Sequence, residues 1–199
     1  MELKRVVVTG LGALTPLGHT VEETWEALKS GKSGAGPITH FDASQFKTQF
    51  ACEVKNFNVT DYIDRKEARK MDIYEQYAVV AAMEAMKDAN FDLETLDRTK
   101  AGVVLGVGIG GMHTFEEECS NWAVNGKEMG PKFSPFLIPK MIADIASGQI
   151  SIMYGFHGPN FTTTSACASS TNAIADAFNL IRLGKANVML TGGAEGAIY

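Results

Sequence analysis

Short β-branched runs that end in glycine alternate along this chain with stretches of helical spacing. The runs at residues 4–12, 101–111 and 186–193 each predict a buried strand that stops at a glycine turn. Apolar residues recur with helical spacing in four segments, residues 21–30, 65–90, 141–154 and 168–183. Strands that alternate with helices indicate an α/β fold on a largely parallel sheet.

Two other segments lack such a period. Residues 31–60 and 125–139 combine turn chemistry with mixed polarity, and predict excursions at the edge of the sheet. No repeat or low-complexity linker divides the chain, so residues 1–199 are expected to form one domain or most of one. The sequence ends a few residues after the predicted strand at 186–193, where a further element would be expected, which predicts an incomplete domain.

The composition narrows the class of protein. Of the 199 residues, 45% are hydrophobic and 21% are charged, as in ordinary globular domains. The net charge of −5 argues against a nucleic-acid partner, because phosphate backbones favour clustered positive charge. No signal peptide or membrane-spanning run is present, which predicts a cytoplasmic protein with no membrane association. The three cysteines lie far apart, which predicts reduced thiols and no metal site.

A glycine-rich turn raises a first functional hypothesis. Gly106, Gly108 and Gly111 follow a predicted strand with the G-x-G-x-x-G spacing of dinucleotide-binding folds. Such folds also place an acid about 20 residues further on to bind the ribose. Residues 130–132 are Gly-Pro-Lys instead, so tight turns and close packing explain these glycines better. A nucleotide-binding module remains an alternative at this point.

The segment at residues 65–90 is predicted to form one long helix, and four basic residues lie at its start. The pairs Arg65 with Arg69 and Lys66 with Lys70 are each four residues apart, so like charges would stack on one helix face. Such a run is either a solvated face or a docking surface for an acidic partner.

Cys167 is the residue that most suggests catalysis. Residues 160–166 are strand-like and residues 168–183 are helix-like, so Cys167 is predicted at a strand-to-helix corner. Free N–H groups at a helix N-terminus favour the nucleophilic thiolate, and the small neighbouring residues leave room for a substrate. The alternative is a small buried packing residue. That alternative is preferred for Cys52 and Cys119, which lack the corner.

Six blocks of sequence occur in an order that is typical of one enzyme family. They are residues 6–18 (VVVTGLGALTPLG), 65–72 (RKEARKMD), 106–112 (GVGIGGM), 134–139 (SPFLIP), 152–170 (IMYGFHGPNFTTTSACASS) and 192–195 (GGAE). Together they resemble the first part of a β-ketoacyl-acyl-carrier-protein synthase, most closely the bacterial elongating type called synthase II.

The resemblance implies a thiolase-like fold, in which two α/β halves stack as alternating helix and sheet layers, as a homodimer. Residues 1–199 would be the incomplete first half, and the second half would be absent from this chain. Cys167 would take an acyl group as a thioester, and decarboxylated malonyl-acyl-carrier protein would attack it in a Claisen condensation, as in fatty acid elongation. Substrates would arrive on the phosphopantetheine arm of acyl carrier protein, with no bound cofactor. The backbone N–H of Cys167 would form part of the oxyanion hole.

The same resemblance assigns further residues. Lys66, Arg69 and Lys70 would dock the carrier protein, and Ile109 and Leu137 would line the acyl pocket. The family's two catalytic histidines and a lysine have no match, because the four histidines of this sequence lie outside those motifs: His19, His40, His113 and His157.

Two expectations follow for residues 1–199 by themselves. They should not catalyse condensation, and their uncovered apolar faces should favour aggregation or a partner. A non-catalytic fragment or scaffold that binds the carrier protein is the main alternative.

Overall fold

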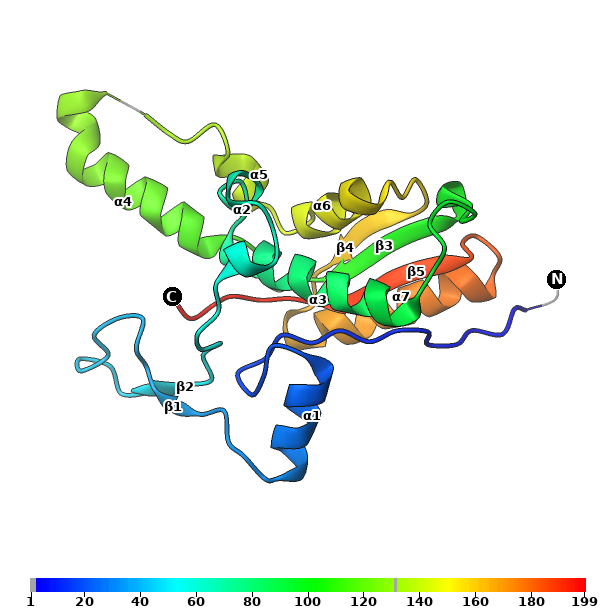
Figure 1. Cartoon of the computed structure of the whole chain (residues 1–199). Helices are drawn as coiled ribbons and strands as arrows, with labels where there is room; N and C mark the ends of the chain where they lie inside the picture. Colours follow the sequence, from blue (N-terminus) through cyan, green and yellow to red (C-terminus); the bar gives the residue numbers. More distant parts are fainter. Residues whose placement is uncertain (1–2, 131) are drawn as a thin grey trace.

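The computed structural model describes residues 3–130 and 132–199, and its centre is a three-stranded parallel sheet (Figure 1). The strands lie in the order β4 (Asn160–Thr163), β3 (Ala101–Gly106) and β5 (Val188–Gly193). All residues of β3 are buried, because β3 is the central strand. The predicted parallel sheet is therefore confirmed, although β5 is only half-buried.

Helices cover both faces of this sheet. Figure 1 places α6 (Ile145–Tyr154) and α7 (Ser169–Arg182) on opposite sides of it. Val103 and Leu105 of β3 pack into a cluster with buried residues of α6 and of α3 (Ile73–Ala89). Side chains on a strand alternate between its faces, so Val104, which lies between these two, faces α7. Layers of helix, sheet and helix result, as the α/β prediction requires.

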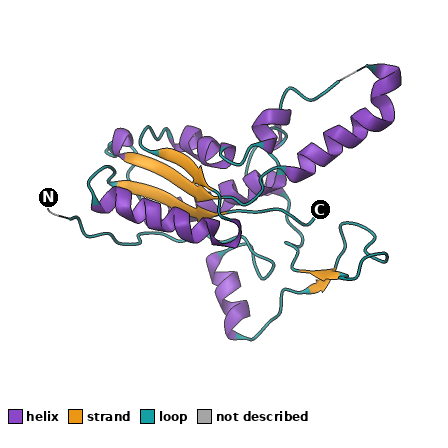
Figure 2. Ribbon diagram, turned by 180° about the vertical axis from the view of Figure 1, so that it is seen from behind, coloured by secondary structure: helices purple, strands orange, loops and turns teal. Residues whose placement is uncertain are grey.

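α7 covers the sheet with small side chains and leaves large ones outside. Ala173 and Ala177 are buried, whereas Ile174 and Phe178 are 52% and 42% exposed. Figure 2 shows this helix lying along the sheet with its outer side uncovered among the described residues. The expected uncovered apolar face is present.

The prediction of one helix over residues 65–90 is wrong at its start. α2 (Arg65–Ala68) is a separate short helix, and α3 begins at Ile73. Asp72 separates them, because its carboxylate accepts a hydrogen bond from the first turn of α3 while Glu75 accepts one from the Asp72 N–H. This capping box requires non-helical backbone at Asp72, so the helical pattern is interrupted there.

The predicted strand at residues 4–12 is also wrong. The segment runs extended along α3 and pairs with none of the described strands. Its N–H groups and those just after it bind side chains of α3 instead: Leu11 donates to Asp88 and Ala13 donates to Glu84, at 2.9 and 2.8 Å. Two of its valines are 60% and 79% exposed. A β-branched run favours extended backbone, but pairing depends on a neighbouring strand.

The excursion predicted at residues 31–60 is mostly irregular and lies apart from the sheet (Figure 1). Short elements in and around it are α1 (Val21–Lys29), β1 (Gly36–Pro37), β2 (Phe50–Ala51) and η1 (Val59–Asp61). A further short turn, η2 (Arg98–Lys100), lies elsewhere and leads directly into β3. β1 and β2 form a small antiparallel ribbon.

The excursion predicted at residues 125–139 is helical at both of its ends and irregular at residues 130 and 132–136. α4 (Met112–Met129) continues through the Asn-Gly pair at 125–126, and α5 (Leu137–Met141) follows. Figure 1 shows α4 projecting from the body of the molecule. Turn residues inside a helix weaken it only modestly, so the local turn signal did not decide the structure here. None of the helices in the described part of the chain has the length and apolarity needed to cross a membrane.

Candidate active site

Three loops leave the sheet side by side at the carboxyl ends of its strands. Gly106 of β3 lies opposite Thr163 of β4 on one side and Gly193 of β5 on the other. The loops are also hydrogen-bonded to one another: the Val107 N–H donates to the Thr163 carbonyl and the Ala194 N–H to the Gly106 carbonyl, both at 3.1 Å. This edge is where open α/β sheets place their reactive groups.

Cys167 lies on the loop that follows β4. It is the central residue of η3 (Ala166–Ala168), which leads directly into α7, so the predicted strand-to-helix corner is confirmed. The side chain is exposed, which excludes the alternative of a buried packing residue. Its backbone N–H donates no hydrogen bond within residues 3–130 and 132–199. A free N–H beside an accessible sulfur can bind negative charge that develops on a substrate oxygen.

The turn before Cys167 has a conformation that few side chains adopt. Ala166 has φ of 49°, in the left-handed region. Ser169 holds this turn, because its hydroxyl donates to the Ala166 carbonyl at 2.7 Å and accepts the Ser165 N–H at 2.9 Å. Ser169 is only 4% exposed, so water has little access to the hydroxyl end of these bonds. The sequence offered no signal for its role beyond its place in a run of small residues.

Two strand-end glycines allow α7 to approach the sheet. A Cβ at Gly106 would collide with the backbone of Ser169, and one at Gly193 would collide with the hydroxyl of Ser170. Close packing therefore explains these glycines, as the sequence favoured.

The loop after β3, residues 108–111, is bound on both sides. One carboxylate oxygen of Glu195 accepts the N–H groups of Gly108 and Ile109, each at 2.9 Å. On the other side, the Gly111 N–H donates to the Met141 carbonyl at 3.0 Å. The N–H groups that a pyrophosphate would need are thus occupied, which argues against the nucleotide-binding alternative.

The two residues expected in the acyl pocket lie on neighbouring segments. Ile109 is the one side chain of the loop at 108–111 other than glycine, and it is 56% exposed. Leu137 is half-buried and begins α5, the helix whose last residue, Met141, binds this loop.

The basic residues lie on the short helix α2 and just after it, so they do not belong to one long helix as expected. Arg69 is still one helical turn from Arg65, because its N–H donates to the Arg65 carbonyl at 3.2 Å. Lys66 and Arg69 are exposed and form no ion pair within the described residues. Lys70 forms an exposed ion pair with Glu67, at 2.7 Å between Nζ and Oε1. Two of the three predicted docking cations are therefore available to a partner, and the third is partly neutralised.

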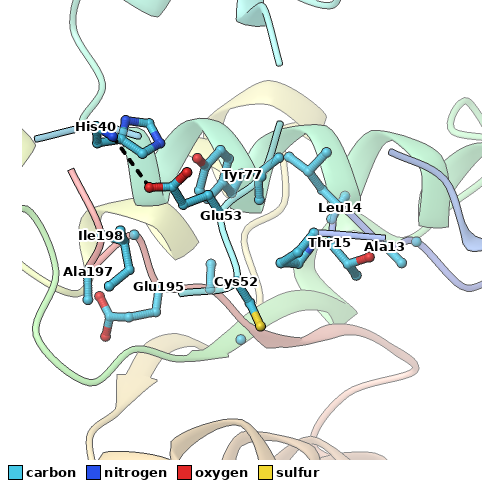
Figure 3. A pocket seen from close by; sticks show the side chains of 17 residues that line it. Ala13, Leu14, Thr15, His40, Cys52, Glu53, Tyr77, Glu195, Ala197 and Ile198 are labelled. Carbon is cyan, nitrogen blue, oxygen red and sulfur yellow. Dashed lines mark hydrogen bonds between the residues drawn. The ribbon is translucent and has the colours of Figure 1, made fainter. Parts of the chain in front are cut away.

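A cavity of about 390 Å³ lies beside the end of β5 and the segment that follows it, and Figure 3 shows its lining. Cys52 lines it and Cys167 does not. Cys52 and Cys119 are both exposed, so the prediction that they are buried packing residues is wrong. Glu53 in this lining accepts the N–H of Thr39 at 2.9 Å, and this bond holds the pKa of Glu53 below its usual value.

The four histidines are expected to lie outside the catalytic motifs, and the contacts of His19 and His113 are made elsewhere in the structure. No histidine side chain of the described residues forms a hydrogen bond with residues 163–169. His19 bonds to the Lys55 carbonyl, and His113 packs against Tyr199. Within the same residues, no three His, Cys, Asp or Glu side chains gather closely enough to hold a metal ion.

Comparison with known proteins gives a consistent result. The family model described as "Beta-ketoacyl synthase, N-terminal domain" matches residues 3–199. A 3-oxoacyl-[acyl-carrier-protein] synthase 2 of Staphylococcus aureus (strain COL) is 47% identical over 195 residues, which are 98% of this chain and 46% of the relative. The Synechocystis sp. protein of that name is 46% identical over 198 residues, covering 100% of this chain and 47% of the relative. The chain thus spans about half the length of these curated relatives.

Solved structures agree with the fold. The ishigamide ketosynthase/chain length factor matches with a TM-score of 0.89 and 31% identity, over 98% of this chain and 48% of that one. A type II PKS ketosynthase solved with its acyl-carrier protein matches with a TM-score of 0.82 and 27% identity, over 97% of this chain and 51% of that one.

Proposed function

Because the chain belongs to the β-ketoacyl synthase family, we propose that it forms the nucleophile-bearing part of a synthase II type enzyme that lengthens acyl chains. The observation that carries this proposal is the geometry at Cys167. Its exposed sulfur lies in a turn just before a helix, and hydrogen bonds from Ser169 fix this turn. The backbone N–H of Cys167 has no partner among the described residues. Acyl transfer needs both an accessible nucleophile and a donor for the developing oxyanion.

The first step of the proposed reaction is transfer of an acyl group to Cys167. The thiolate attacks the thioester carbonyl of an acyl group carried on the phosphopantetheine arm of acyl carrier protein. A new carbon–sulfur bond forms, and the Cys167 N–H helps to bind the negative oxygen of the tetrahedral intermediate. The bond to the carrier's sulfur then breaks and the carrier leaves as its thiol, after taking up a proton. No bound cofactor is required, since the carrier supplies the activated acyl group.

The second step is condensation with malonyl-acyl-carrier protein. Loss of carbon dioxide produces a carbanion, which attacks the Cys167 thioester and releases the lengthened chain from the sulfur. Groups that stabilise the carbanion and the oxyanion contribute most of the rate of such a step. No described histidine side chain bonds to the loop of Cys167. We therefore expect residues 1–199 by themselves to show no condensation activity.

We further propose that acyl carrier protein docks on Lys66 and Arg69, with a smaller contribution from Lys70. The support is their exposed positive charge on a chain of net charge −5, which would orient an acidic partner and speed its encounter. The similar type II PKS ketosynthase was solved in complex with its acyl-carrier protein. Ile109 and Leu137 are proposed to line the acyl pocket. The resemblance to the family also supports a cytoplasmic homodimer.

The test is mass spectrometry of the full-length gene product after incubation with an acyl carrier protein that bears a medium-length acyl chain. We expect one acyl adduct, located on Cys167 by peptide mapping and absent from Cys167→Ala. Cys52→Ala and Cys119→Ala are matched controls and should keep the adduct. A wild-type protein that binds the carrier without forming any adduct would favour the non-catalytic scaffold instead.

A further inference from the structure

The carboxylate of Glu195 reaches from the end of β5 to the loop that follows β3. We propose that Glu195 is a positioning residue that sets which acyl chain lengths are accepted, by holding the loop that carries Ile109. This inference rests on the proposed function, because it concerns the acyl pocket of that reaction.

Glu195 holds one side of the loop at residues 108–111. One oxygen of Glu195 accepts two consecutive N–H groups, those of Gly108 and Ile109, each at 2.9 Å. A Cβ at Gly108 would lie 2.8 Å from this oxygen, so glycine leaves the space that the carboxylate occupies. Hydrogen bonds to a charged acceptor are roughly twice as strong as neutral ones.

The opposite side of the loop is held by backbone alone. Gly110 has φ of 85°, and its position against the backbone of Met141 and Ala143 leaves no room for a side chain. The Gly111 N–H donates to the Met141 carbonyl. Glu195 is thus the side-chain anchor of a loop whose glycines would otherwise allow many conformations.

The loop at residues 108–111 exposes one side chain beyond its glycines. Within residues 108–111, Ile109 is the only residue with a side chain, and that side chain is 56% exposed. The hydrogen bond from Glu195 ends on the N–H of Ile109 itself, so the carboxylate fixes the backbone from which the isoleucine projects. A wall of a substrate pocket discriminates between chain lengths only if it keeps its position.

The consequence for specificity has a direction. In Glu195→Ala, both N–H groups lose their acceptor and the loop gains freedom, so Ile109 can withdraw from a longer chain. We expect the ratio of kcat/KM for the best acyl chain to kcat/KM for one several carbons longer to fall by about tenfold. The reason is that one methylene in a pocket changes kcat/KM by about tenfold or more. Glu195→Gln keeps a carbonyl oxygen that can accept the same hydrogen bonds, and should narrow the preference much less.

The experiment uses the full-length gene product and measures kcat/KM for acylation of Cys167 across a series of acyl carrier proteins of increasing chain length. Glu195→Ala, Glu195→Gln and wild type are compared. Glu94→Ala is the matched control, because this exposed glutamate forms no side-chain hydrogen bond or ion pair within residues 3–130 and 132–199. A narrowed preference in Glu195→Ala, largely restored in Glu195→Gln, supports the inference. A uniform loss of rate at every chain length overturns it, since that is what a merely structural role would produce.

A second readout does not depend on catalysis. Amide hydrogen exchange of a peptide that contains residues 108–111 should be faster in Glu195→Ala than in wild type and in the control. Unchanged exchange would show that the carboxylate does not hold the loop, and would overturn the inference even if activity changed. If wild type formed no adduct on Cys167, the proposed function would fail and the role in specificity with it, whereas the exchange result would still report on the hydrogen bonds.

Discussion

Removal of one buried hydroxyl next to the candidate nucleophile should disturb both stability and acyl transfer. In Ser169→Ala the turn at Ala166 loses the hydrogen bond to its carbonyl, and the Ser165 N–H loses its acceptor. Ser169 is 4% exposed, so water cannot readily replace the missing hydroxyl. Alanine fits the same space and lies in a helix that tolerates it well, so the lost bonds are the main change.

The magnitude follows from two opposing effects. The Ala166 carbonyl still accepts the Ser169 N–H, so loss of its bond to the hydroxyl costs about 1 kcal/mol net. The Ser165 N–H is left without its acceptor, which costs about 1–3 kcal/mol. Ala166 stands at φ of 49°, and relaxation of this left-handed residue would return about 1–2 kcal/mol. The net loss of unfolding free energy is therefore about 1–2 kcal/mol. Since the turn also orients the Cys167 N–H, and removal of an oxyanion donor costs about 100-fold or more, partial misalignment should slow acylation by about tenfold or more.

The assay is urea unfolding of the full-length gene product together with the rate at which Cys167 takes up an acyl group. Ser170→Ala is the matched control: it is the same substitution one residue further on, at an exposed side chain with no hydrogen bond within the described residues. The control should stay within about 0.5 kcal/mol of wild type. If Ser169→Ala behaved like Ser170→Ala in both measurements, the hydroxyl would not hold the turn and the reasoning would be refuted.

Two further predictions concern charges. Burial raises the pKa of Glu75 to about 8, so between its unfolded value of 4.5 and about 8 the folded state holds a proton that the unfolded chain lacks. The free energy of unfolding should therefore fall as pH rises through this window and level off above it. In urea titrations at pH 5 and 8, Glu75→Gln should show a smaller difference in unfolding free energy between the two pH values than wild type. A wild-type unfolding free energy that rises with pH would contradict this. Reversal of Lys66 and Arg69 to glutamate should weaken binding of acyl carrier protein by about tenfold at low salt and less at high salt, as measured by titration of the carrier. The control is reversal of Lys29 and Lys32 to glutamate, which changes the net charge by the same amount at another place on the surface. If this control weakened carrier binding equally, the net charge of the protein would matter and the surface near α2 would not.

Features that depend on local sequence could be predicted. The β-branched runs that became β3 and β5, and the corner at Cys167, each combine a strand pattern, a turn of small residues and a helical period within a short segment. Such signals need no knowledge of distant residues.

Features that depend on distant partners could not be predicted. Residues 4–12 have the composition of a strand, but their N–H groups and those just after them find carboxylates on α3, more than 70 residues away. The break before α3 depends on Asp72, which also accepts two hydrogen bonds from Thr114. A sequence pattern records the preference of a segment, whereas these outcomes depend on what lies beside it.

Glu195 illustrates the same limit at the candidate site. Its partner N–H groups lie 87 and 86 residues earlier in the chain, and the glycines around both segments predict turns without showing that the turns meet. They meet because Gly106 and Gly193 are opposite one another in the register of β3 and β5, which puts the two following loops at the same edge. A shift of that register would move Glu195 away from the loop of Ile109, so the proposed control of chain length depends on strand pairing and not on the loop sequences alone.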